Sequence, residues 1–213
     1  PAFLTGSLLV SHHQILRYTS DRSLGDSPRT TIVVAVVQDG RATWIHCGDS
    51  RLYMVRAGQM VTRTRDHSYL ELRNASFQGL ENVNRNVLFT CLGSPSKPVF
   101  DISEPVLLEQ GDRLLLCSDG LWGSLDDEKI ARELSKAAVS EAVPTLVEDA
   151  LRHAGSSSDN VTVVAMEWET PDQFSSTLGI STDSISDDVF ASTIQAGLMD
   201  SSFSEEIDDL DDE

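Results

Sequence analysis

The chain has 213 residues, of which 40% are hydrophobic and 23% charged, so it can form one domain with a sizeable core. Its formal net charge of −18 argues against nucleic acid as a partner, because an acidic surface repels a phosphate backbone. The longest unbroken apolar stretch, 32–37, is far shorter than the roughly 20 residues that cross a bilayer, so no membrane segment is expected.

Cysteine usage and the start of the chain bear on location. Cys47, Cys91 and Cys117 are an odd number without a C-x-x-C pair, and no charged and then apolar leader opens the chain. We therefore expect buried thiols in a reducing compartment and a cytoplasmic protein.

The negative charge is concentrated at the end of the chain. Residues 171–213 contain twelve acidic residues and no Lys or Arg, and the remainder carries a formal charge of only −6. The Ser- and Asp-rich composition of this end predicts a mobile tail or one short helix. We divide the chain into a domain at 1–169 and an acidic tail at 170–213.

The first element is a predicted helix. Apolar residues recur at helical spacing between Leu4 and Thr19. Because the chain starts at Pro1 with almost no lead-in, we expect that an upstream segment has been cut off. His12 follows the apolar stripe, which favours packing over metal binding, and His46 and His153 need no catalytic role.

The next part of the sequence predicts an antiparallel meander. Turn signals at Asp39-Gly40 and Ala57-Gly58 separate segments of strand composition, and no helix is long enough for a parallel crossover. The predicted strands are 31–38, 42–47, 51–56 and 59–64. An irregular stretch follows at 66–96, with a short helix near 69–74.

Regular structure returns in the second half of the domain. We expect strands at 100–108, 113–118 and 161–168, with a turn at 109–112 between the first two. Two helices fall between the last two strands. Ser124, followed by acidic residues, is expected to cap the first helix, which ends near Ser135; Ser140 is expected to cap the second, which ends at Gly155.

Two acidic motifs adjoin the last buried strands. Asp119-Gly120 directly follows the strand at 113–118, and Asp159-Asn160 directly precedes the strand at 161–168. If these strands share a sheet, both carboxylates converge at its edge, and clustered oxygen ligands suit Mg²⁺ or Mn²⁺. The alternative for each motif taken singly is an ordinary turn or loop.

Four motifs occur in a fixed order: Gly48-Asp49-Ser50-Arg51, Asp66-His67-Ser68, Cys117-Ser118-Asp119-Gly120-Leu121-Trp122 and Ser158-Asp159-Asn160-Val161-Thr162-Val163. Their order and spacing over residues 30–167 resemble the type 2C metal-dependent protein serine/threonine phosphatases (PPM-type). The combination is highly specific, although no single motif is. The short connections are more like those of bacterial members.

The resemblance implies an α+β fold of two stacked antiparallel sheets flanked by helices, an α-β-β-α sandwich whose first strands are missing here. It implies a two-metal centre of Mg²⁺ or Mn²⁺, at which a metal-activated water hydrolyses phosphoserine or phosphothreonine in proteins. Asp119 and Asp159 match ligands of one metal, with Ser118, Gly120 and Asn160 as neighbours. Phosphorylated proteins are the implied substrates, and a Ser/Thr kinase is a candidate partner.

The sequence departs from the family pattern in three respects. The D-G-x-G-G motif, whose Asp bridges the metals, and the upstream Arg that holds phosphate are not among these residues, so we expect this chain alone to be nearly inactive. Asp49 matches a position that helps hold a weaker third metal, but Gly123 stands where the family has another Asp. The alternative is that Asp49 only shapes a turn, with Arg51 pairing to it or to a neighbour.

Two other functions remain open from the sequence. One is a pseudophosphatase, or phosphoprotein-binding regulatory module, that docks phosphoproteins or kinases without turnover. The other is a protein-interaction role for the acidic tail, with the domain as its carrier.

Overall fold

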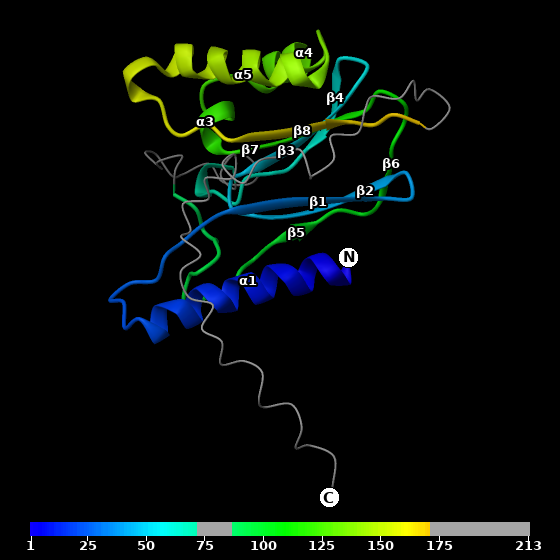
Figure 1. The fold of residues 1–213 in the computed structure, drawn as a ribbon. Helices are drawn as coiled ribbons and strands as arrows, with labels where there is room; N and C mark the ends of the chain where they lie inside the picture. Colours follow the sequence, from blue (N-terminus) through cyan, green and yellow to red (C-terminus); the bar gives the residue numbers. More distant parts are fainter. Residues whose placement is uncertain (72–86, 171–213) are drawn as a thin grey trace, which may run out of the picture. The chain divides into compact units, whose positions relative to one another are not determined.

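The computed structural model describes residues 1–71 and 87–170, all of which fall within one compact unit that spans Pro1–Gln173. Helix, sheet, sheet and helices follow one another as four layers (Figure 1). The predicted α-β-β-α sandwich is therefore confirmed. The acidic segment at 171–213, and the predicted helical turn beyond residue 71, lie outside the described residues.

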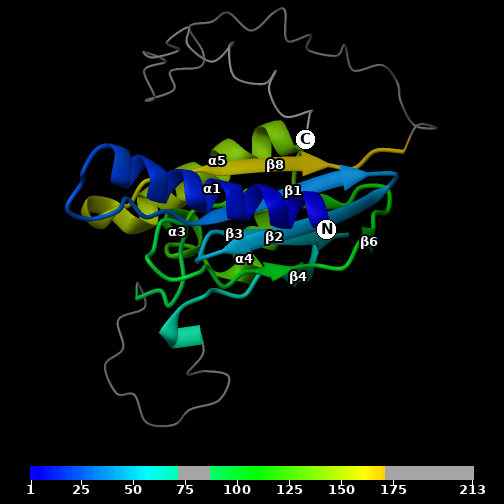
Figure 2. The same ribbon diagram turned by 90° about the horizontal axis from the view of Figure 1, so that it is seen from below.

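The first sheet is covered on its outer face by the opening helix. Its strands are β1 (Ile32–Gln38), β2 (Arg41–Cys47), β5 (Asp101–Ile102) and β6 (Val106–Leu107), all paired antiparallel. Helix α1 (Ala2–Asp21) runs along this sheet in two perpendicular views (Figures 1 and 2). The core between them contains Leu4, Leu8, Ile45, Cys47 and Leu92.

The second sheet has the strand order β4-β3-β7-β8 and is also antiparallel. Its strands are β4 (Gln59–Arg63), β3 (Arg51–Arg56), β7 (Arg113–Cys117) and β8 (Val163–Glu167). The helices α3 (Asp119–Trp122), α4 (Asp127–Leu134) and α5 (Val139–Ala154) cover its outer face (Figure 1). Leu121, Ile130, Leu134 and Leu146 from these helices are fully buried against Tyr53 and Leu115.

A separate apolar core joins the two sheets. It contains Ala42 and Trp44 from β2, Leu52 and Met54 from β3, and Leu108 and Leu114. Because β2 is covered on both faces, five of its seven residues are buried. No helix in the described ranges is long and apolar enough to span a bilayer.

The predicted meander is partly wrong, because its two hairpins belong to different sheets. Each hairpin has the expected turn: Asp39 and Gly40 have φ of 52° and 68°, and Ala57 and Gly58 have φ of 48° and 78°. Strands β2 and β3 do not pair, however, and the chain crosses between the sheets at 48–50. Gly48 allows this crossing with φ of 108°, where a Cβ would lie 2.4 Å from Thr31 Cγ2.

The predicted strand at 100–108 is interrupted. The structure has two short strands there, β5 and β6, both paired to β2. Ser103 uses its side-chain oxygen to accept from the Trp44 N–H at 3.0 Å, and Pro105 has no N–H to donate. Both features break the regular ladder between these strands.

Two helices start at other residues than predicted, and one short helix is not predicted. Asp126, and not Ser124, caps α4, since its carboxylate accepts from the Lys129 N–H at 2.6 Å. Helix α5 begins at Val139, so Ser140 lies inside it, although Gly155 ends it as expected. The sequence does not predict the short helix α3, because a single turn leaves no periodic pattern to detect.

Candidate metal centre

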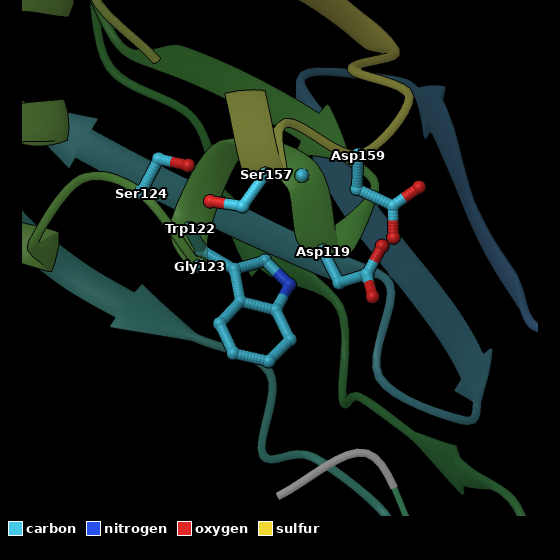
Figure 3. Close-up of a pocket in the computed structure, with 7 residues that line it drawn as sticks. Asp119, Trp122, Gly123, Ser124, Ser157 and Asp159 are labelled. Carbon is cyan, nitrogen blue, oxygen red and sulfur yellow. The ribbon is translucent and has the colours of Figure 1, made fainter. Parts of the chain in front are cut away.

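Asp119 lies just after a strand of the second sheet, at the start of a helix that covers this sheet. Strand β7 ends at Cys117, Ser118 takes an extended conformation, and Asp119 opens the single-turn helix α3. Leu121, two residues further on, is fully buried and anchors this turn in the core. Asp119 is half-buried and directed into a small pocket (Figure 3).

Asp159 approaches from the neighbouring strand. Cys117 of β7 pairs with Val163 of β8, and the Ser118 N–H extends this ladder by donating to the Thr162 carbonyl at 3.0 Å. The Ser118 hydroxyl donates to the Asn160 carbonyl and accepts from the Thr162 N–H, both at 3.0 Å. Ser118 thus holds the two strand ends together.

The structure brings Asp119 and Asp159 together, as their positions beside paired strands predict. Their carboxylates point toward each other at one side of a pocket of about 150 Å³ (Figure 3). The lining residues are Asp119, Gly120, Trp122, Gly123, Ser124, Ser157 and Asp159. Gly123, which takes the place of a family Asp, adds no carboxylate to this pocket.

Asp49 comes to the same region from the crossing between the sheets. Burial is the main reason that the pKa of its carboxyl rises from 3.8 to about 6, and the negative charges of Asp119 and Asp66 add to the increase. The Trp122 Nε1–H donates to the Asp49 backbone carbonyl at 3.0 Å. Asp49 thus shares the electrostatic environment of Asp119.

The donor set fits a divalent cation. Carboxylate oxygens are the ligands that Mg²⁺ and Mn²⁺ prefer. Burial first, and then the charges of Asp119 and Asp66, raise the pKa of Asp49, and a bound cation would favour its charged form. Asp119, Asp159 and Asp49 are thus the residues that could hold a metal here.

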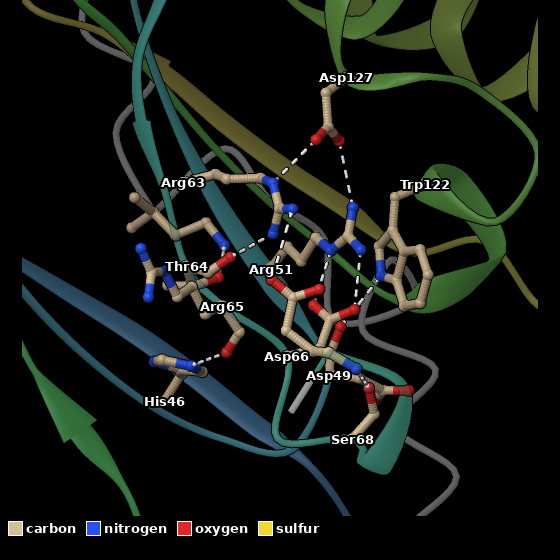
Figure 4. A network of polar contacts seen from close by, with 12 residues as sticks. His46, Asp49, Arg51, Arg63, Thr64, Arg65, Asp66, Ser68, Trp122 and Asp127 are labelled. Atoms are coloured by element: carbon tan, nitrogen blue, oxygen red, sulfur yellow. Dashed lines mark hydrogen bonds and ion pairs between the residues drawn. The ribbon is translucent and has the colours of Figure 1, made fainter. Parts of the chain in front are cut away.

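A network of charged side chains surrounds Arg51, two residues after Asp49 (Figure 4). Arg51 donates from Nε and Nη2 to the two carboxylate oxygens of Asp66, each at 2.7 Å, and from Nη1 to Asp127 at 3.1 Å. Its guanidinium also stacks on Trp122, with Cζ 3.7 Å from the ring centroid. Arg51 accordingly pairs with neighbours of Asp49 and not with Asp49 itself.

Another group of ligand-type side chains among the described residues is His46, His67 and Asp101, whose ligand atoms lie within 4.8 Å of one another. The two rings are stacked, 4.5 Å apart with 18° between their planes, so their nitrogens do not converge on one point. His46 donates from Nε2 to the Arg65 carbonyl at 2.7 Å, its Nδ1 is buried without a partner, and burial lowers its pKa. A metal would require the rings to turn apart, so we assign this group a structural role.

Sequence reasoning misses the supporting residues around the acidic cluster. Asp66 and Trp122 belong to two of the four family motifs, but nothing in the motif spacing indicates that both contact Arg51. The sequence marks Asp127 only as a first-turn acid of α4, and it also accepts hydrogen bonds from Arg51 and from Tyr53 Oη, at 3.1 and 2.8 Å. A buried ion pair between distant segments has no local signal that could reveal it.

Comparison with known proteins shows which proteins this chain resembles. No sequence-family profile matches the chain. It is 33% identical over 144 residues to the serine/threonine protein phosphatase PstP of Mycobacterium tuberculosis, an alignment that covers 65% of this chain and 27% of PstP. It is 30% identical over 164 residues to the protein phosphatase PhpP of Streptococcus pneumoniae, covering 74% of this chain and 64% of PhpP.

Solved structures agree with these relatives. The M. tuberculosis phosphatase PstP/Ppp superposes with a TM-score of 0.64 at 29% identity, covering 75% of this chain and 68% of that one. Stp1 of Staphylococcus aureus superposes with a TM-score of 0.68 at 25% identity, covering 79% and 68%.

The fold is that of the bacterial serine/threonine phosphatases. The chain belongs to the type 2C (PPM-type) family of protein phosphatases. It spans about a quarter of the length of PstP and less than two thirds of PhpP.

Proposed function

We propose that the protein containing these residues is a metal-dependent protein serine/threonine phosphatase. The observation that carries the proposal is the pair of carboxylates, Asp119 and Asp159, that line one pocket and point toward each other (Figure 3), with Asp49 near enough to Asp119 for its charge to act on Asp49. A solved structure of the PstP catalytic domain, 29% identical to this chain with a TM-score of 0.60, is described in complex with two manganese ions.

The proposed roles follow from position. Asp119 and Asp159 hold one Mg²⁺ or Mn²⁺, and Asp49 contributes to a weaker site near Asp119. Bound divalent cations lower the pKa of a water molecule and neutralise charge on phosphoryl oxygens. In the overall reaction a water oxygen bonds to phosphorus, the bond to the serine or threonine oxygen breaks, and that oxygen takes up a proton.

The scope of the proposal extends beyond the pocket. Residues 1–169 form the phosphatase domain, and 170–213 form a separate acidic tail. The D-G-x-G-G motif is not among the 213 residues, so residues 1–213 by themselves are expected to bind metal weakly and turn over slowly. The proposed substrates are phosphorylated proteins, with a Ser/Thr kinase as a candidate partner. A cytoplasmic location suits the free and buried thiols of Cys47 and Cys117.

The test is phosphate release from a phosphothreonine peptide by the longest reading frame that contains these residues. Release is measured with Mn²⁺, with excess chelator, and with Asp119→Asn. Asp39→Asn is the matched control, because Asp39 lies in a hairpin turn at φ of 52°, which Asn adopts readily. We expect Mn²⁺-dependent release that Asp119→Asn abolishes and Asp39→Asn preserves. Absence of release under every condition would overturn the proposal in favour of a pseudophosphatase.

A further inference from the structure

The three-residue crossing at 48–50, which carries Asp49, is held by the motif Asp66-His67. His67 makes two hydrogen bonds to Gly48: its N–H donates to the Gly48 carbonyl at 2.9 Å, and its Nδ1 accepts from the Gly48 N–H at 3.2 Å. His67 is buried, and its Nε2 lies 3.3 Å from an Asp101 carboxylate oxygen. The residue directly before Asp49 is thus fixed on both its donor and its acceptor.

Asp66 is connected to the backbone of Asp49 through the side chains of Arg51 and Trp122. Its carboxylate, 6% exposed, accepts two hydrogen bonds from Arg51 at 2.7 Å, which fixes the plane of the guanidinium. The guanidinium lies over the Trp122 ring, and Trp122 donates from Nε1 to the Asp49 carbonyl at 3.0 Å (Figure 4). The Arg51–Asp66 pair thus contacts the same indole that donates to Asp49.

We propose that Asp66 and His67 are positioning residues that hold Asp49 in place for metal binding, with Arg51 and Trp122 as the link from Asp66. This inference rests on the proposed metal site, and it gives a role to a motif that the carboxylate cluster does not itself use. Hydrogen-bonded partners behind metal ligands orient those ligands. Here the support acts on the ligand's backbone, because Asp49 lies in a short crossing and not within a helix or strand.

Asp66→Asn is the main test variant, and the chain provides a matched control. Arg56, at the opposite end of β3, donates from Nε and Nη2 to the two carboxylate oxygens of Asp112, again at 2.7 Å, and that carboxylate is fully buried. Asp112→Asn therefore breaks an equivalent ion pair in the same strand away from Asp49. A loss of metal binding caused by general destabilisation should appear in both variants.

Trp122→Phe is the second variant, because Asp66→Asn also removes a negative charge near Asp49. Phenylalanine keeps an aromatic face for Arg51 and changes no charge, but it cannot donate to the Asp49 carbonyl. If positioning is the cause, Trp122→Phe weakens metal binding in the same direction as Asp66→Asn.

Two measurements on the full chain decide the inference. The first is hydrogen exchange of the backbone amides at 48–50 without metal, which we expect Asp66→Asn to accelerate and Asp112→Asn to leave unchanged. The second is Mn²⁺ titration, for which we expect about 10-fold weaker binding in Asp66→Asn and a change of less than about 2-fold in Asp112→Asn. In an Asp49→Asn background, Asp66→Asn should cause no further loss, because both changes act through one ligand.

The outcomes separate this inference from the proposed function. Faster exchange at 48–50 in a chain that binds no Mn²⁺ supports the positioning of the crossing and counts against the metal site. Equal effects of Asp66→Asn and Asp112→Asn on both measurements would overturn the positioning role, as would additive effects of Asp66→Asn and Asp49→Asn on Mn²⁺ affinity.

Discussion

Gly120 packs so tightly against Asn160 that a Cβ on Gly120 would lie 2.5 Å from the Asn160 carbonyl oxygen. This contact sets the spacing between the segments that carry Asp119 and Asp159. The backbone of Gly120 is helical, so the need for glycine comes from the neighbouring backbone and not from φ.

Gly120→Ala is therefore expected to separate the two acidic segments. We expect the free energy of unfolding to fall by about 1–3 kcal/mol, the cost of forcing an extra carbon into a packed site, and Mn²⁺ binding to weaken. Thermal denaturation and Mn²⁺ titration measure the two effects. Gly6→Ala is the control, because Gly6 lies in α1, where an added Cβ would meet no atom within 4 Å, and alanine there should stabilise by about 0.5–1 kcal/mol. A Gly120→Ala protein as stable as the parent would contradict the expected clash.

The raised pKa of Asp49 predicts how metal-free stability depends on pH. Its carboxyl has a pKa of about 6 in the folded chain against an ordinary value of 3.8, so the folded state binds the proton more tightly. The corresponding stability is complete below about pH 4 and is lost as the pH rises through about 6. Allowing for partial solvent screening, we expect a loss of about 1–2 kcal/mol.

Asp49→Asn should remove this loss. The measurement is denaturant unfolding at pH 4.5 and pH 7 with chelator present. Between these two pH values the parent should lose about 1–2 kcal/mol of unfolding free energy through Asp49, and Asp49→Asn should not. Parallel pH profiles for the two proteins would mean that Asp49 is not destabilised by burial and its acidic neighbours.

The sequence predicts the fold well wherever the pattern is local. The turns at Asp39-Gly40 and Ala57-Gly58 depend on nearby residues and occur as expected. The pairing of β7 with β8, which brings Asp119 and Asp159 to one sheet edge, joins distant segments and is only a condition when the sequence is read alone. The assignment of β2 and β3 to different sheets does not follow from local pattern. Both strands are rich in apolar residues, and only packing between the sheets decides that the chain crosses over at Gly48.

The candidate site divides in the same way. Motif order singles out Asp49, Asp119 and Asp159. The structure places Asp119 and Asp159 on one pocket, and the charge of Asp119 acts on Asp49. The supports of Asp49 are contacts between segments distant in sequence: Arg51 and Asp66 are 15 residues apart, and Asp49 and Trp122 are 73 apart. No periodicity or motif spacing specifies such pairs.

The start of α4 provides a direct test of one corrected prediction. Asp126→Ala is expected to cost about 0.5–2 kcal/mol of unfolding free energy, because the Lys129 N–H loses its side-chain acceptor. Ser124→Ala should cost clearly less, since Ser124 does not cap this helix. Urea denaturation of both variants measures the difference. A larger effect at Ser124 would restore the assignment made from sequence.

Two buried leucines allow an effect on stability to be distinguished from an effect on the position of Asp119. Leu121 and Leu134 are both fully buried against the outer face of the second sheet, but Leu121 lies in α3, two residues after Asp119, whereas Leu134 ends α4. Either substitution to alanine should lower the free energy of unfolding by about 2–5 kcal/mol through lost burial and cavity formation. Because Leu121 belongs to the same single turn as Asp119, only Leu121→Ala should also displace Asp119 and weaken Mn²⁺ binding. The comparison is made by Mn²⁺ titration at a temperature where both variants remain folded by circular dichroism. If both variants bind Mn²⁺ as the parent does, Asp119 is positioned by its hydrogen-bonded strand end at Ser118 and not by the core beneath α3.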